Sequence, residues 1–162
     1  MYKKIMVPLD GSELAECVLP HVESLAKGCG ASDVVFMRVV EPAFYPASAE
    51  YASGGSRREE EEAATWQRYD QQHKTEAKQY LDDITKRGNY GKVAVKAEVV
   101  TGKAAETIAE YAEKKGVDLI VIATHGRSGV SRWVFGSVAD KVMRSACVPV
   151  MMVRAPGCMP GI

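Results

Sequence analysis

Short hydrophobic runs alternate along this chain with longer stretches in which apolar residues recur every three or four positions. Uninterrupted runs rich in Val and Ile are typical of strands buried on both faces, and the three- to four-residue spacing predicts helices. Such an alternation predicts an α/β fold, an open parallel five-stranded sheet with helices on both faces. The predicted strands are Ile5–Leu9, Val34–Val40, Val93–Val100, Val117–Ala123 and Val148–Val153.

Four helices are predicted around these strands. The first is capped by Ser12 and runs to about Lys27, with a stripe of Leu14, Cys17, Val18, His21, Val22 and Leu25. The second is longer and carries Trp66, Tyr69, His73, Ala77, Tyr80, Leu81 and Ile84. The third runs from about Ala104 to Lys115 and uses Ala105, Ile108, Ala109 and Ala112. The fourth starts at Gly136–Ser137 and pairs Val138 with Val142 and Ala139 with Met143 at i,i+4 spacing.

Two of the strands have the pattern of sheet edges. Val93–Val99 alternates apolar and polar residues, which indicates one partly solvated face. Val148–Val153 contains Pro149, and proline within a sheet favours an edge. An apolar edge promotes aggregation unless it is covered, so Val148–Val153 is expected to pair with a second copy of the chain in a homodimer.

Residues 1–154 are expected to form one domain, with a long mobile loop over 41–58 and an unstructured tail over 155–162. The loop contains Pro42, Pro46 and two glycines, and it follows the second strand. That position is the ligand-binding edge of an open α/β sheet. The loop is therefore either a lid over a ligand or a connection without a function.

Composition narrows the class of protein. The chain has 162 residues, 46% of them hydrophobic, and 21 basic residues balance 21 acidic ones, so no strong field favours nucleic acid or a membrane surface. No signal peptide is expected at the amino terminus, and no run approaches the roughly 20 apolar residues of a membrane span. We therefore expect a cytoplasmic protein. Its four cysteines form no C-x-x-C pair and are expected to be free thiols.

The segment from Ala123 to Ser137 has the features of a phosphate-binding loop. It connects a predicted strand to a predicted helix and contains Gly126, Gly129 and Gly136. Glycines let backbone amides approach a ligand, and the free amides and partial positive charge at a helix start favour an anion.

These residues resemble the universal stress protein family of the nucleotide-binding kind. The family signature is glycine, two residues, glycine, nine residues, glycine, then serine or threonine, and the corresponding residues here are Ala123, Gly126, Gly136 and Ser137. The opening Ile5–Ser12 resembles the first strand and turn of the family. The resemblance spans essentially the whole chain and implies a Rossmann-like, adenine nucleotide alpha hydrolase-like sheet of order 3-2-1-4-5.

Ala123 departs from the signature, which has glycine at that place. The added methyl group costs little if φ is negative there, but it interferes if φ is positive or if the ligand touches Cα.

The resemblance also implies an adenine-nucleotide site. Its residues are Pro8, Leu9, Asp10 and Val39 around the adenine, Ala123, His125, Gly126, Arg127, Ser128 and Gly129 around the ribose and phosphates, and Gly136, Ser137 and Val138 at the phosphate chain. A carboxylate such as Asp10 can accept a hydrogen bond from the exocyclic amino group of the base while aliphatic neighbours pack the ring. Asp10 is also a common turn residue before a helix cap. His125 has no orienting partner that would make it a general base.

The function implied by the resemblance is a homodimeric stress-response regulator whose state depends on bound ATP, with Mg²⁺ or Mn²⁺, and which acts on signalling partners that the sequence does not identify. No catalytic residue and no protein metal ligand is assigned, so a binding protein is expected rather than an enzyme. Two alternatives remain open. One is a slow ATPase, for which Arg127, Arg132, Ser137 and His125 are present without an obvious carboxylate for the metal. The other is a nucleotide-free interaction module of the same fold.

Overall fold

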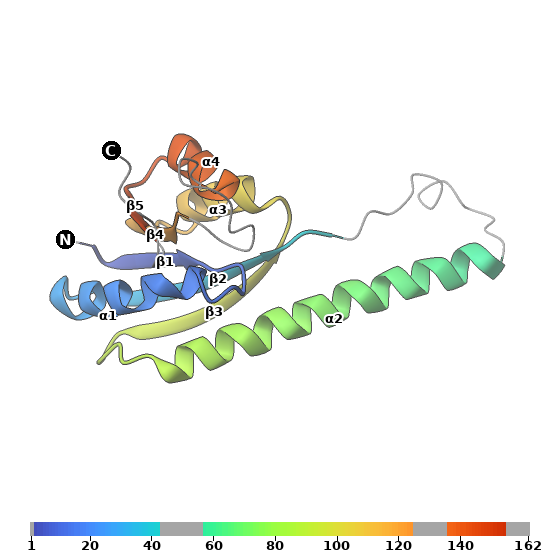
Figure 1. Cartoon of the computed structure of the whole chain (residues 1–162), viewed down its shortest axis with the longest axis horizontal. Coiled ribbons are helices and arrows are strands. Elements are labelled where there is room, and N and C mark those ends of the chain that lie inside the picture. Colours follow the sequence, from blue (N-terminus) through green and yellow to red (C-terminus); the bar gives the residue numbers. More distant parts are fainter. Residues whose placement is uncertain (1, 43–56, 125–135, 155–162) are drawn as a thin grey trace.

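The computed structural model of the chain describes residues 2–42, 57–124 and 136–154. The elements are β1 (Lys4–Pro8), the 3-10 turn η1 (Ala15–Val18), α1 (Leu19–Gly28), β2 (Asp33–Val40), α2 (Arg57–Arg87), β3 (Ala94–Thr101), α3 (Ala104–Lys114), β4 (Leu119–Ala123), α4 (Ser137–Ser145) and β5 (Val150–Val153). The strands form one parallel sheet of order β3-β2-β1-β4-β5 (Figure 1). The predicted fold class, the strand order and the two edges are confirmed.

Helices cover both faces of this sheet (Figure 1). Successive residues of a strand point to opposite faces, so Ile5 and Val7 of β1 belong to the core under α1 and α2, whereas Met6 belongs to the core under α3 and α4. Because both faces are buried, the central strands are largely apolar, with Lys4, Asp33 and Arg38 as the charged residues of β1 and β2. Polar groups that could contact a ligand are therefore expected in the loops at the carboxyl ends of the strands.

The first helix was predicted to be continuous, and this prediction is wrong. The segment folds as η1 followed by α1, and Pro20 occupies the first turn of α1. Pro20 has no amide to donate to the carbonyl of Glu16; that carbonyl accepts instead from Leu19, three residues on, in a 3-10 bond. The buried stripe is Val18, Val22 and Ala26, and His21, predicted to lie on the stripe, is exposed.

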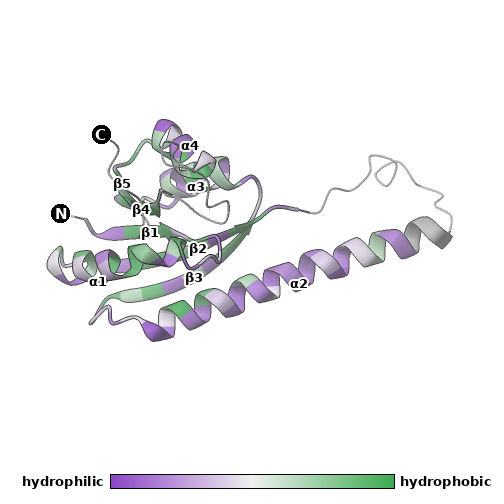
Figure 2. Cartoon of the chain, in the orientation of Figure 1, coloured by the Kyte–Doolittle hydropathy of each residue, from purple (hydrophilic) through white to green (hydrophobic). Residues whose placement is uncertain are grey.

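The second predicted helix is confirmed, but its amino-terminal half has no sheet beneath it. Its 31 residues span about 46 Å, whereas the eight residues of β2 or β3 span about 26 Å. The helix therefore projects past the sheet (Figure 1). Figure 2 shows that hydrophilic residues prevail along α2. From residue 61 onward, where burial is described, the buried residues of the helix are Ala77, Leu81 and Ile84, all in its carboxyl-terminal half.

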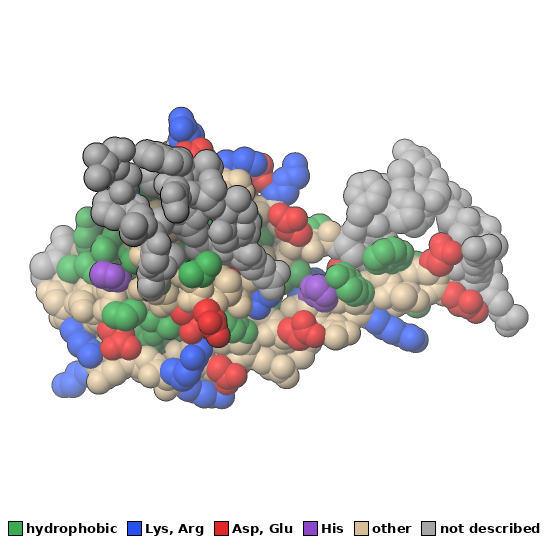
Figure 3. Space-filling view, in the orientation of Figure 1, with side chains coloured by type: hydrophobic (Ala, Val, Ile, Leu, Met, Phe, Trp, Pro, Cys, Tyr) green, Lys and Arg blue, Asp and Glu red, His purple; other side chains and the backbone are tan. Residues whose placement is uncertain are grey.

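Trp66 and Tyr69 were expected on the core-facing stripe of α2 and are instead 38% and 49% exposed. Their rings meet edge to face at 6.4 Å, and Tyr69 also contacts His73 at 4.1 Å between ring centroids. Hydrophobic, acidic and histidine side chains follow one another along this projecting part (Figure 3). The spacing of the stripe was correct, but the sheet ends before the stripe does.

The third and fourth predicted helices are confirmed as α3 and α4. In α4 only one member of each predicted i,i+4 pair is buried. Ala139 and Val142 face the core, while Val138 and Met143 are exposed. The nine-residue helix therefore packs on the core along a stripe of two buried residues.

The amino ends of β1 and β4 are tied together by Asp118. Its Oδ2 accepts hydrogen bonds from the backbone amides of Lys3 at 2.8 Å and Lys4 at 2.7 Å. The bond from the Lys4 amide, and then that from Lys3, hold the pKa of the Asp118 carboxyl below its ordinary value. This clasp stabilises the end of the sheet opposite the carboxyl ends.

Candidate functional site

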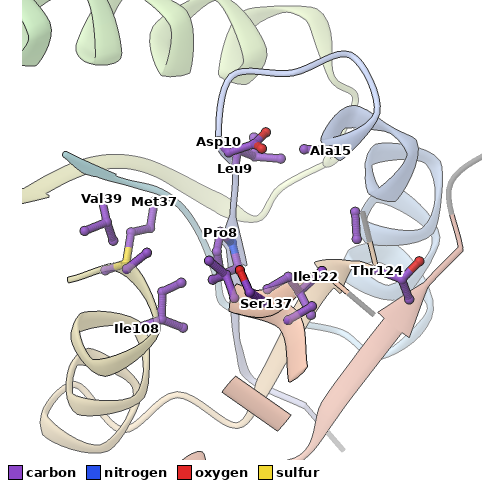
Figure 4. Close-up of a pocket in the computed structure, with 15 residues that line it drawn as sticks. Pro8, Leu9, Asp10, Ala15, Met37, Val39, Ile108, Ile122, Thr124 and Ser137 are labelled. Carbon is purple, nitrogen blue, oxygen red and sulfur yellow. The ribbon is translucent and has the colours of Figure 1, made fainter. Parts of the chain in front are cut away.

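A cavity of about 270 Å³ lies at the carboxyl ends of β1 and β4, where the strand order reverses (Figure 4). Such a reversal is the usual position of a ligand in an open α/β sheet. The lining residues are Pro8, Leu9, Asp10, Ala15, Met37, Val39, Ala104, Ile108, Ile122, Ala123, Thr124, Gly136, Ser137, Val138 and Ala139. Most of them are apolar, and the few polar groups lie at the loops.

One wall of the cavity is aliphatic. Met37, Val39 and Ile108 lie together on one side of it (Figure 4). The amide of Leu9 donates to the carbonyl of Met37 at 2.8 Å, which holds the end of β1 against β2. The wall is therefore built on fixed backbone and is suited to a flat, largely apolar ring.

Asp10 follows β1 and lines the cavity at the turn into η1. Its Oδ1 accepts from the amide of Ser12 at 2.9 Å and from the hydroxyl of Ser12 at 2.6 Å. Ser12 Oγ in turn accepts from the amide of Ala15 at 3.2 Å. The interpretation of Asp10 as a turn residue is thus confirmed, and the same turn sets the carboxylate at the cavity.

The start of α4 forms the other end of the cavity. Gly136 is the N-cap residue, and no side chain among the described residues caps the helix. The amide of Gly136 donates to the carbonyl of Thr124 at 2.6 Å, so this amide is already used. Ser137 and Val138 occupy the first turn, where amides have no partner inside the helix. The donors at this end come from Ser137 and Val138 rather than from Gly136.

Ala123, which stands at the first glycine of the family signature, is the last residue of β4 and pairs with Val153. It therefore has the extended backbone of a strand, in which an L residue carries a methyl group without strain. Its side chain belongs to the core under α1 and α2. The replacement of glycine by alanine is accommodated by the fold.

The structure brings together all the described residues predicted for the site. Pro8, Leu9, Asp10, Val39, Ala123, Gly136, Ser137 and Val138 all line the cavity. The remaining predicted residues, His125, Gly126, Arg127, Ser128 and Gly129, lie outside the described residues, as does Arg132. The proposed lid over 41–58 also lies outside them, except for its first two residues and the start of α2.

Several cavity residues were missed by sequence reasoning. Met37 precedes Val39 by two positions on one strand, and the two-residue period of a strand is a signal that could have found it. Ala104 and Ile108 come from α3, which begins at the carboxyl edge directly after β3. Thr124, which is 2% exposed, falls within the predicted phosphate-binding segment Ala123–Ser137 but was not singled out as a site residue.

The same described ranges hold neither a metal cluster nor a membrane span. No group of three or more His, Cys, Asp or Glu side chains there is placed to hold a metal ion. Nor is any helix in those ranges long and apolar enough to cross a membrane. Cys17, Cys29 and Cys147 are free, and Cys158 lies in the part of the chain that is not described.

The sequence was compared with known proteins. The model of the universal stress protein family matches residues 1–154. Universal stress protein MJ0531 of Methanocaldococcus jannaschii is 31% identical over 156 residues, covering 96% of this chain and 84% of the relative. Universal stress protein MJ0577 of the same organism is 30% identical over 162 residues, covering 95% and 96%.

Solved structures also match this chain along nearly its whole length. The structure of MJ0577 superposes with a TM-score of 0.77 and covers 97% of this chain and 99% of its own. A universal stress protein in complex with cAMP, at 19% identity, has a TM-score of 0.61 and covers 95% and 98%. An Arabidopsis thaliana protein of the family with AMP bound, at 15% identity, has a TM-score of 0.55 and covers 96% and 93%. With a family match along nearly its whole length, the chain belongs to the universal stress protein family.

Proposed function

We propose that the chain is an adenine-nucleotide-binding universal stress protein, a homodimeric regulator whose state depends on whether ATP is bound. It acts by binding rather than by catalysis, in the cytoplasm. Its partners in signalling would recognise the nucleotide-bound or the nucleotide-free form.

The observation that carries this proposal is the combination of groups around one cavity. An aliphatic wall, the Asp10 carboxylate and the uncapped start of α4 line the same space. An adenine ring packs on aliphatic side chains, its amino group donates to a carboxylate, and phosphate accepts from helix-start amides. Two proteins of the same fold were solved with cAMP and with AMP, which supports an adenine nucleotide as the ligand class.

The described residues fit ATP with Mg²⁺ or Mn²⁺. Asp10 and Val39 would hold the base, and the amides of Ser137 and Val138 with the Ser137 hydroxyl would hold phosphate oxygens. Mg²⁺ in nucleotide sites is bound largely by phosphates and water, with one or two protein oxygens. The bound metal would neutralise phosphate charge, so the site does not require a dedicated cage of carboxylates.

Calorimetry with purified protein and ATP, AMP or GTP, with and without Mg²⁺, tests the proposal. We expect tighter binding of ATP and AMP than of GTP. Asp10→Asn should weaken ATP binding by about tenfold to a hundredfold, because a hydrogen bond to a charged group contributes about 1.5–3 kcal/mol. Glu13→Gln is the control, because Glu13 is an exposed carboxylate of the same turn that does not line the cavity. Absence of ATP binding would refute the nucleotide site.

Two further measurements separate the alternatives. For a binding protein we expect ATP turnover far below the about 1 s⁻¹ at which typical enzymes begin. Faster turnover that is lost in Ser137→Ala would favour the ATPase. Mass spectrometry of the small molecules released on denaturation distinguishes a nucleotide-binding protein from a nucleotide-free interaction module, because the module would release no adenine nucleotide.

The proposed dimer uses β5, which pairs only with β4 among the described strands. The carbonyls of Pro149 and Val153 accept from β4, so the amides of the alternate residues, including Met152, point away from it. Met152→Pro should therefore remove an outward donor and yield a folded monomer in light scattering. Met152→Ala loses the side chain but keeps the amide, and it should stay dimeric. A dimer that survives Met152→Pro would exclude this edge.

A further inference from the structure

We propose that Arg38 is a positioning residue of the nucleotide site: its guanidinium, held on the ring of Tyr80, fixes the turn that presents Asp10 to the ligand. The inference rests on the proposed function, because it assigns to Arg38 the placement of the carboxylate that would meet adenine.

Arg38 lies on the face of the sheet away from the cavity. It stands on β2 between Met37 and Val39, both of which line the cavity, and alternation along the strand turns Arg38 toward α2. Its guanidinium carbon is 5.4 Å from the centroid of the Tyr80 ring. This is within the range of a cation–π contact, which holds the planar group in one orientation.

The guanidinium also lies against the turn itself. Gly11 follows Asp10 directly and has φ of +83°, a conformation that favours glycine. A Cβ atom built on Gly11 would lie 2.7 Å from Arg38 Nη1 and 2.9 Å from Cζ. The guanidinium thus fills the space that a side chain at position 11 would occupy, and it packs directly on the backbone of the turn.

The charged groups near Tyr80 act on the pKa of its hydroxyl. Burial raises the pKa of the Tyr80 hydroxyl above its ordinary value, and the Glu16 carboxylate raises it further. The Asp10 carboxylate also raises this pKa and Arg38 lowers it, so both act on the same hydroxyl. Glu16 has a cation partner of its own, since its Oε2 pairs with Arg87 Nη2 at 3.2 Å. Arg38 lies against Gly11 instead, so its loss would remove a positive charge and a packed group from the turn that carries Asp10, and the turn would loosen.

The expected consequence is an effect on binding that passes through Asp10. Arg38 has no place in the cavity wall, so it would act on the ligand by holding the carboxylate and the Asp10–Ser12 turn in position. Loss of Arg38 should then weaken recognition of adenine only while Asp10 is present to recognise it.

A double-mutant cycle on the full chain tests this with ATP as the probe. Arg38→Met should weaken ATP binding about tenfold in the wild-type background, and Arg38→Lys should restore part of the loss because it keeps the charge. In the Asp10→Asn background Arg38→Met should have little further effect. Lys96→Met is the matched control, since Lys96 is a cation on neighbouring β3 that pairs with Asp33 at the amino end of the sheet.

Tyr80 provides a second pair of variants that does not alter Arg38. Tyr80→Leu removes the aromatic face and should weaken ATP binding, while Tyr80→Phe keeps that face and should not. Equal losses from Arg38→Met with and without Asp10 would overturn the inference, as would wild-type affinity in Arg38→Met. A wild-type protein that binds ATP with an additive cycle refutes only the role of Arg38. A wild-type protein that binds no ATP refutes the proposed function as well.

Discussion

Leu81 and Trp66 lie on the same predicted stripe of α2, but their replacement by alanine should have very different effects on stability. Leu81 is fully buried in the core under α1 and α2, where a Leu→Ala change costs about 2–5 kcal/mol. Trp66 is 38% exposed on the part of the helix beyond the sheet, and its ring meets that of Tyr69. An aromatic pair of this kind contributes about 0.5–1.5 kcal/mol beyond the area that it buries, and since no sheet lies beneath Trp66 we expect this pair to set the cost of Trp66→Ala.

Urea unfolding followed by circular dichroism measures both free energies. With a slope of about 2 kcal/mol per molar urea, Leu81→Ala should lower the midpoint by about 1–2.5 M and Trp66→Ala by less than about 0.8 M. The slope itself should not change. If Trp66→Ala costs as much as Leu81→Ala at every protein concentration, Trp66 packs on the body of the same chain in solution, and the reasoning about the projecting helix is refuted.

Three further changes have outcomes that follow from single contacts. Asp118→Asn should lower the free energy of unfolding at neutral pH by about 1–2 kcal/mol, because a charged acceptor of two amides becomes neutral. The Asp118 pKa is lower in the folded state, so its stabilisation is present above the ordinary carboxyl pKa and is lost as pH falls through the folded value. The wild-type advantage over Asp118→Asn should therefore vanish in acid titrations of stability. Gly136→Val should abolish ATP binding in calorimetry while the melting temperature holds, because φ of −52° and ψ of 138° suit valine and Gly136 lines the cavity, where added bulk would compete with phosphate. Binding at wild-type affinity would contradict the site. Tyr90→Phe should leave thermal stability unchanged or raise it, because the buried Tyr90 hydroxyl has no hydrogen-bond partner among the described residues and burial raises its pKa to about 12; a clear loss of stability would show that a partner exists.

Local pattern predicted the elements of this fold well because the sheet is buried on both faces. Runs such as Val34–Val40 can satisfy the core on each side only as strands. The split of the first helix also had a visible signal, since Pro20 lacks the amide that a continuous helix needs. The strand order came from the family resemblance, because spacing along a chain does not determine which strands become neighbours.

Local pattern failed where burial or hydrogen bonding depends on elements that are distant in the sequence. The stripe through Trp66 and Tyr69 has the right period, but burial depends on how far β2 and β3 reach beneath it. The hydrogen bond from Gly136 to Thr124 redirects an amide that the motif assigned to phosphate. In the sequence Arg38 is an ordinary polar interruption of a strand, and only the structure shows that its guanidinium lies near both Gly11 and Tyr80.

Because α2 is long, a small tilt of the helix produces a large displacement of its amino-terminal end. Ala77 is the buried residue of the helix nearest its free end among those described, and Arg57 lies 20 residues further out, about 30 Å along the axis. A tilt of about 10° about Ala77 would displace that end by about 5 Å, from the same helix rise. A pair of distance labels, one near the tip of α2 and one on the sheet, would therefore magnify a small adjustment at Tyr80 into a measurable change.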